Sequence, residues 1–280
     1  MPLPAETALS EGMTDAMSPA MTDAMTGTMA GTMAGAAPQF VPLPSLCVFG
    51  DSHIASVKLA LDRGLLPYVT DHLEFWGAEG PSFRLLDFRN NAVIAPKRVQ
   101  PIVARINGMG REVLEGDAFS AILFYGARLR MSKFLPRQVA ILCNGGHLSR
   151  AVRSRAARNF LEAAKPYRMA RNFAKANPGT RITFAPAPLL TQGIGHPGWI
   201  WPGSEKAGPQ ERAEVRGWLD EEAAKDGVTL LHQPDETVVD GCFTDPVWAV
   251  EEGLRDQDGV HKSAEFAAMM IGRYREMMAG

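Results

Sequence analysis

Residues 45–59 read SLCVFGDSHIASVKL, and this stretch decides the fold. Its apolar run, Leu-Cys-Val-Phe, is typical of a strand that is buried on both faces of a sheet. Gly50 ends the run and permits a tight turn, and the apolar residues that follow recur at helical spacing. The pattern therefore predicts a strand, a turn and a helix at about 53–65, with Asp51 or Ser52 as the helix cap.

Ser52 lies in the predicted turn, where its hydroxyl would stand clear of the sheet edge, near the positive end of the helix dipole. A serine needs a base before it can attack a carbonyl carbon. The sequence DGVH at 258–261 offers one, just before a helical pattern near the end of the chain. Each motif alone is also a common turn or helix start. Their order and wide separation favour a Ser52, His261, Asp258 triad.

The two motifs, GDSH at 50–53 and DxxH at 258–261, resemble the first and last blocks of the SGNH (GDSL-type) hydrolase superfamily. A His directly after the Ser is similar to the form seen in carbohydrate O-acyl esterases and in O-acetyltransferase SGNH domains. The resemblance covers residues 44–279 in pieces. It implies a three-layer α/β/α, flavodoxin-like parallel sheet, with Ser52, His261 and Asp258 as catalytic residues and no cofactor.

The resemblance also implies an oxyanion hole, to which the backbone N–H of Ser52 would contribute. Residues 77–82 read GAEGPS and resemble the second family block, which gives Gly80 the role of a second backbone donor. The third block is Gly-x-Asn-Asp, but residues 126–129 read GARL, so Arg128 replaces the asparagine. Its guanidinium is expected to meet the oxyanion, to bind a substrate anion, or to be a surface group of an inactive site.

Four further residues are expected at the substrate. Asp51 and His53 flank Ser52, and His53 is interpreted as a rim or structural residue rather than a second base. Trp199 and Trp201 lie in a Gly-, Pro- and Trp-rich loop, where they would stack on a sugar ring or serve packing. The other histidines show no metal-ligand spacing, so no metal site is predicted.

Further strands and helices alternate along the chain, which predicts an α/β sheet of about five strands with the site at their carboxyl ends. The additional strands are expected at 72–76, 119–125 (ended by Gly126), 182–185 and 228–231, with a possible short one at 93–94, and clear helices at 210–225 and 264–278.

Residues 1–43 form a separate Met-, Ala-, Thr- and Gly-rich segment in which Met recurs every fourth residue. Its glycines disfavour a helix, and we expect a disordered tail before one domain at 44–280. The segment lacks a basic region and an apolar core, so it does not read as a signal peptide. With three scattered cysteines and no apolar stretch of membrane-spanning length, a cytoplasmic location is expected.

The net charge of −2 identifies no partner, but charge is unevenly distributed. Residues 128–181 carry thirteen Lys or Arg and one acid, whereas 205–258 carry fifteen acids and five basic residues. Two solvated helical faces of opposite charge are the favoured interpretation, and nucleic-acid binding is not expected.

The sequence thus predicts a serine esterase that acts on a small-molecule or glycan O-acyl ester, such as an O-acetylated carbohydrate. Two alternatives stay open. One is an O-acyltransferase, and the other is a weak or inactive SGNH-like binding module whose basic segment, 128–181, binds an anionic partner. The oligomeric state is left open.

Overall fold

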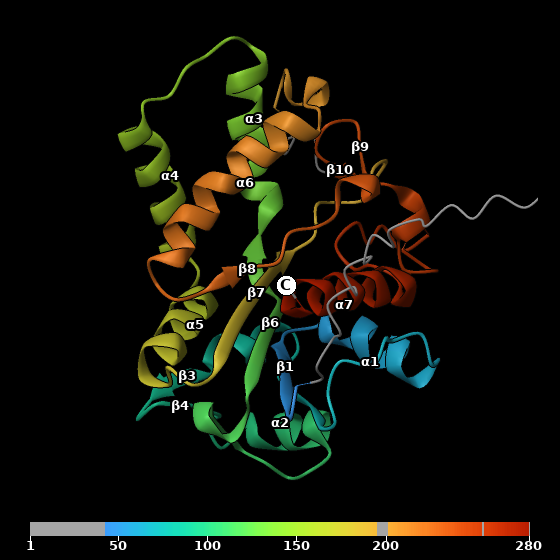
Figure 1. Ribbon diagram of the computed structural model, residues 1–280. Coiled ribbons are helices and arrows are strands. Elements are labelled where there is room, and N and C mark those ends of the chain that lie inside the picture. The colour runs from blue at the N-terminus through green and yellow to red at the C-terminus, as the bar shows by residue number, and fades with distance from the viewer. Residues whose placement is uncertain (1–42, 195–200, 254, 280) are drawn as a thin grey trace, which may run out of the picture. The chain divides into compact units, whose positions relative to one another are not determined.

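The computed structural model describes residues 43–194, 201–253 and 255–279 (Figure 1). A five-stranded parallel sheet forms its centre, in the order β2-β1-β6-β7-β8. The strands are β1 (Leu46–Gly50), β2 (Leu73–Gly77), β6 (Ala121–Arg130), β7 (Arg181–Ala187) and β8 (Thr229–Leu230). Among these five strands the second lies at the edge beside the first, which is the flavodoxin-like order, and the predicted fold class is confirmed.

Helices cover both faces of this sheet (Figure 1). One face carries α1 (Ile54–Asp62) and α7 (Ala264–Ala279), which pack on each other. The other face carries α3 (Leu135–Cys143), α4 (Arg150–Ala163), α5 (Lys165–Ala176) and α6 (Pro209–Ala224). The remaining helix is α2 (Gln100–Asn107).

The two faces of β1 show why its apolar run is continuous. Leu46 and Val48 pack in one buried cluster with residues of α1 and α7. Cys47 and Phe49 point the other way, into a larger cluster with residues of α4, α5 and α6. Successive side chains of a strand alternate between faces, so a strand covered on both sides needs apolar residues at every position.

Two small antiparallel sheets complete the described fold. One contains β3 (Asp87–Arg89), β4 (Ala92–Ile94) and β5 (Val113–Glu115), and the other pairs β9 (Val238–Val239) with β10 (Phe243–Thr244). The sequence indicated only the strand at 93–94, because segments of two or three residues are too short to show a period.

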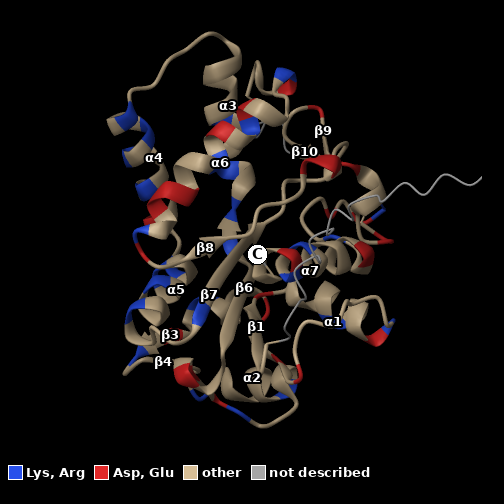
Figure 2. Cartoon of the chain, viewed as in Figure 1, with Lys and Arg blue, Asp and Glu red and all other residues tan. Residues whose placement is uncertain are grey.

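The two charged segments contact each other through α4 and α6. Basic positions of α4 lie beside acidic positions of α6 (Figure 2), and two arginines of α4 form ion pairs there. Arg153 lies 2.9 Å from Glu214, and Arg158 lies 3.1 Å from Glu222 and 2.6 Å from Asp226. Two of the cations in 128–181 are therefore neutralised by acids of the second segment.

The expected tail at 1–43 lies outside the described residues, apart from Leu43. No helix in the described ranges has the length and apolar character needed to cross a bilayer.

Candidate active site

Ser52 lies in the turn between β1 and α1, as the sequence predicts. The helix begins one residue later than expected, at Ile54, and ends at Asp62 rather than near 65. Its cap position is occupied by His53, which makes no side-chain capping bond, so the predicted cap by Asp51 or Ser52 is wrong. The Asp51 carboxylate instead accepts hydrogen bonds from the His53 backbone N–H and from its ring.

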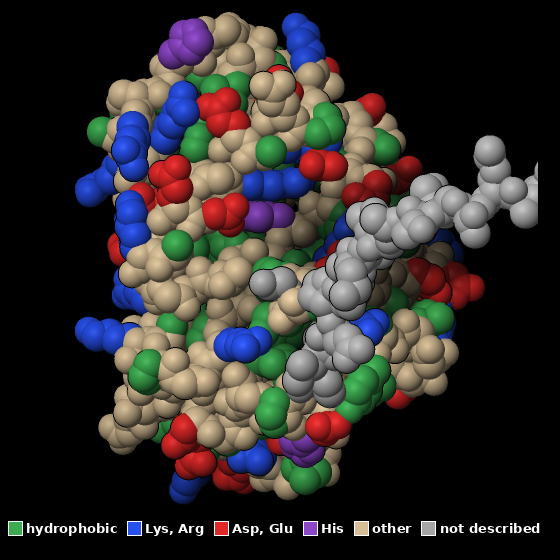
Figure 3. Space-filling view, viewed as in Figure 1, with side chains coloured by type: hydrophobic (Ala, Val, Ile, Leu, Met, Phe, Trp, Pro, Cys, Tyr) green, Lys and Arg blue, Asp and Glu red, His purple; other side chains and the backbone are tan. Residues whose placement is uncertain are grey.

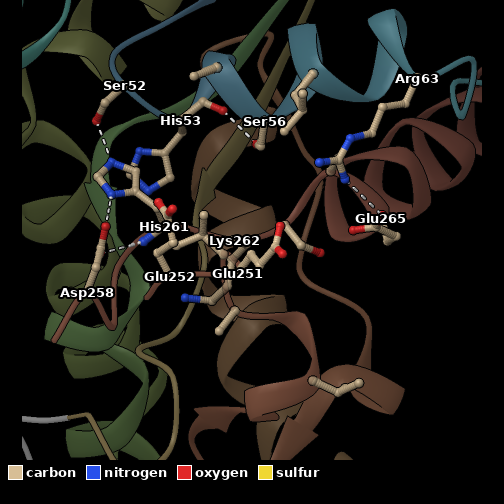
Figure 4. A pocket seen from close by; sticks show the side chains of 17 residues that line it. Ser52, His53, Ser56, Arg63, Glu251, Glu252, Asp258, His261, Lys262 and Glu265 are labelled. Atoms are coloured by element: carbon tan, nitrogen blue, oxygen red, sulfur yellow. Dashed lines mark hydrogen bonds and ion pairs between the residues drawn. The ribbon is translucent and has the colours of Figure 1, made fainter. Parts of the chain in front are cut away.

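Ser52, His261 and Asp258 converge in a hydrogen-bonded chain (Figure 4). The Ser52 Oγ lies 2.7 Å from His261 Nε2, and His261 Nδ1 lies 2.6 Å from Asp258 Oδ2. The distances place the three side chains within the range that nucleophile, base and orienting acid require. The predicted convergence is confirmed.

The loop that carries Asp258 and His261 is held by backbone contacts. The Asp258 Oδ1 accepts the N–H groups of Val260 and His261, at 2.9 and 3.1 Å. The Gly259 carbonyl accepts a 2.8 Å bond from the N–H of Thr191, in the segment that follows β7. Although burial alone would raise the pKa of Asp258, its bonds to His261 and to these backbone N–H groups lower it. Asp258 therefore stays ionised, able to orient an imidazole.

A second Asp–His pair lies beside the triad. His53 Nδ1 is 2.8 Å from Asp51 Oδ1, and the His53 ring lies 5.1 Å from the His261 ring, measured between centroids. Both residues are only 6% exposed, and Asp51 is engaged by His53 and Arg128. Burial alone would raise the pKa of Asp51, but its bonds to His53 and the nearby positive charges lower it. Asp51, expected at the substrate, is thus buried behind Ser52, whereas His53 lines the cavity.

The sequence suggested that Arg128 follows the end of a strand, but Arg128 lies within β6. β6 continues past Gly126 to Arg130, with a bulge between these residues, and both Gly126 and Arg128 have positive φ, 72° and 59°. A Cβ on Gly126 would lie 2.5 Å from the His53 ring, so only glycine lets β6 pass this close to the turn. The predicted strand end at Gly126 is therefore wrong: the glycine belongs to a bulge, and glycine is typical of both strand ends and bulges.

The bulge turns the Arg128 side chain toward the Ser52 turn. Its Nη2 donates to the Gly80 carbonyl at 2.5 Å, and its Nε lies 3.7 Å from Asp51 Oδ2. The side chain is 22% exposed, so the guanidinium does not point freely into solvent. Gly80 begins a 3₁₀ helix, η1 (Gly80–Leu85), and within the described residues no acceptor is recorded for its N–H or for that of Ser52. Arg128 thus holds the loop of one expected oxyanion donor beside the turn that carries the other.

A cavity of about 710 Å³ opens beside the triad (Figure 4). Its wall includes Ser52, His53, Asp258 and His261, together with residues for which the sequence gave no signal: Arg63, Glu251, Glu252, Lys262 and Glu265. Arg63 directly follows α1, and the other four lie in the segment before α7 or in its first turn, so their proximity depends on the tertiary fold. A small ester fits a cavity of this volume.

Trp201, one of the two tryptophans expected at the substrate, is not among the residues that line this cavity. Trp201 stacks on Arg137 of α3, with the guanidinium 5.5 Å from the ring centroid, and Trp199 lies outside the described residues. No group of three or more His, Cys, Asp or Glu in the described ranges is arranged to hold a metal ion.

No protein-family model matches the chain, and the curated proteins contain no match to it. Similar solved structures include the periplasmic domain of a Salmonella ser. Paratyphi A lipopolysaccharide acetyltransferase, at 11% identity and a TM-score of 0.39, covering 87% of this chain and 86% of that one. An extracellular lipase from Streptomyces rimosus is 12% identical, with a TM-score of 0.34 and coverage of 81% and 98%.

Proposed function

We propose that the protein is an SGNH-type serine esterase that forms an acyl-enzyme on Ser52. The observation that carries this proposal is the hydrogen-bonded chain from Ser52 Oγ through both ring nitrogens of His261 to Asp258. A carboxylate at Nδ1 favours the tautomer whose Nε2 is free to accept the serine proton. The cavity beside the hydroxyl gives an ester room to approach.

The reaction begins when His261 accepts the Ser52 proton and the Ser52 Oγ attacks the ester carbonyl carbon. The carbonyl oxygen becomes an oxyanion, which the N–H groups of Ser52 and Gly80 would meet, with Arg128 bracing the Gly80 loop. The protonated His261 then donates its proton to the departing alcohol. Attack by water on the acyl-enzyme, with His261 again as base, releases the acid.

The proposed substrate is an O-acyl ester such as an O-acetylated carbohydrate. If a sugar hydroxyl replaced water in the last step, the same residues would perform acyl transfer. The two reactions differ only in the acceptor, so the acceptor must be varied in the test.

A fluorophosphonate probe, which reacts with activated serines, tests the proposal. The wild-type chain should be labelled and Ser52→Ala should not. Ser56→Ala is the matched control, because the Ser56 hydroxyl lines the same cavity but donates to the His53 carbonyl rather than to an imidazole. A panel of short acyl esters, with and without added sugar, then separates hydrolysis from transfer. Unlabelled wild type, or labelling that persists in Ser52→Ala, would defeat the proposal.

A further inference from the structure

A second cavity, of about 310 Å³, is lined in part by Arg128, whose guanidinium also contacts Asp51 and the Gly80 carbonyl. Five cationic side chains and no acidic one line it. They come from η1, β6, the 3₁₀ turn after β6, and α5: Arg84, Arg128, Arg130, Lys133 and Lys165. Phe83 and Met169 add apolar surface to the wall.

The positive charge of this basic cavity is only partly neutralised. Lys165 lies 3.6 Å from Asp87, and Arg128 lies 3.7 Å from the buried Asp51. For Arg84, Arg130 and Lys133, no carboxylate of the described residues lies within ion-pair distance. Arg153 and Arg158 of α4 differ, because they pair with Glu214 and Glu222 of α6. Lys and Arg side chains also gather over α4 and α5 in the space-filling view (Figure 3).

Clustered like charges repel each other. The pKa of Arg128 is lowered, first by burial and then by the charges of Arg84 and Arg130, although Asp51 acts in the opposite direction. The Arg128 backbone is also in the left-handed region, at a φ of 59°. That conformation costs about 1–3 kcal/mol in a residue other than glycine, and such strain is concentrated at ligand-binding sites. An anion bound beside Arg128 would offset the repulsion among these cations.

Arg128 connects this basic cavity to the reactive serine. Its guanidinium reaches Asp51, the residue before Ser52, and the Gly80 loop. The wall of the cavity that Ser52 itself lines has four acids, Asp258, Glu251, Glu252 and Glu265, against two cations, Arg63 and Lys262, and this excess of acids disfavours an anion. An ester with a negatively charged group would therefore place that group on the Arg128 side.

We propose that the basic cavity binds a phosphoryl or pyrophosphoryl group of the ester substrate, an inference that rests on the proposed esterase function. One arginine suffices for a single carboxylate, whereas several converging cations from four separate elements suit a group of higher charge with several acceptor oxygens. Phe83 and Met169 would pack against the carbon skeleton that bears this group.

Direct binding tests the cavity without reference to catalysis. Inorganic phosphate and pyrophosphate are titrated calorimetrically into the full chain, into Arg84→Gln/Lys133→Gln and into Arg155→Gln/Lys175→Gln. Arg84 and Lys133 are exposed, as are Arg155 and Lys175 on α4 and α5, so both double variants should fold and both lose two charges. We expect saturable binding to wild type and to the control, Arg155→Gln/Lys175→Gln. Binding to Arg84→Gln/Lys133→Gln, which removes two charges of the cavity, should be weaker by ~10-fold or more. No saturable binding to wild type, or equal losses in both variants, would overturn the site.

A kinetic comparison tests whether the anion belongs to the substrate. A series of ω-acetoxyalkyl phosphates with two to six methylenes is compared with the corresponding neutral ω-acetoxy alcohols. One length should give a kcat/KM at least ~10-fold above its neutral partner, and Arg84→Gln/Lys133→Gln should lower that ratio. If no phosphate exceeds its partner while neutral esters are cleaved, this inference fails and the esterase proposal stands. If no ester of either series is cleaved, the esterase proposal fails, and calorimetry alone decides whether an anion site exists.

Discussion

The Ser52 hydroxyl lies 2.7 Å from Nε2 of His261, although 209 positions separate the two residues in the sequence. β1 delivers the serine to the carboxyl edge of the sheet, and the loop before α7 delivers the histidine to the same edge. The contact is the basis of the esterase proposal.

The Asp258 carboxylate should be needed for its charge and not only its shape. In Asp258→Asn, the amide NH₂ would face His261 Nδ1 and reverse the tautomer, so Nε2 would carry the proton and could not accept the one from Ser52. We expect kcat on a short acyl ester to fall by ~10³–10⁴-fold. Asp256→Asn, an exposed acid of the same loop that pairs with Arg255, should keep the wild-type rate. Equal rates for the two variants would remove Asp258 from the mechanism.

Arg128→Ala should act mainly on kcat. The guanidinium holds the Gly80 carbonyl, so its loss frees the loop of the proposed oxyanion donor. With a small neutral ester, we expect kcat to fall by ~10–10³-fold with little change in KM, because oxyanion contacts form mainly in the transition state. Steady-state kinetics on wild type and Arg128→Ala measure both constants. A change in KM alone, seen only with charged esters, would restrict Arg128 to anion binding.

Gly126→Ala tests the close approach of β6 to the triad turn. Gly126 has a φ of 72°, and an added Cβ would overlap the His53 ring. Gly64→Ala is the matched control, since Gly64 has a φ of 68° and open space at its Cβ. In both variants the free energy of unfolding should fall by about 1 kcal/mol, because alanine disfavours a left-handed backbone conformation. In Gly126→Ala it should fall by about a further 1–3 kcal/mol from overpacking against His53. Urea unfolding measures the difference, and equal losses would show that the His53 contact is not tight.

Lys262 should make stability depend on pH. Its ammonium is buried and donates to the Gly259 and Val260 carbonyls, and burial lowers its pKa to about 7, against the opposing charge of Asp258. Between pH 7 and the ordinary lysine pKa, the unfolded chain binds a proton that the folded chain has released. The free energy of unfolding of wild type should therefore rise with pH there, by up to about 1.4 kcal/mol per unit, relative to Lys262→Met.

Unfolding at pH 7 and pH 9 checks this dependence. Lys175→Met, which alters an exposed lysine of α5, should show a constant difference from wild type over the same range. If Lys262→Met also showed a constant difference, the buried ammonium would keep its proton in the folded state.

The sequence by itself determined the sheet and the triad. The continuous apolar run in β1 predicts a strand that is covered on both faces. Strands that alternate with helices predict a parallel sheet, in which the carboxyl ends of the strands lie at one edge. Ser52 follows one such end directly, so its position was readable from a local pattern. Asp258 and His261 were readable because they lie three positions apart in a single short loop.

Only the tertiary structure decided what surrounds these residues. Gly126 ends strands and permits bulges equally well, and the His53 ring packed on it selects the bulge that aims Arg128 at Gly80 and Asp51. The basic cavity brings Arg84 together with cationic side chains from β6 and α5. The sequence of 128–181 does not show which of its cations line this cavity and which, like Arg153 of α4, pair with an acid of α6. Ion pairing and close packing depend on contacts between distant segments, which have no period in the sequence.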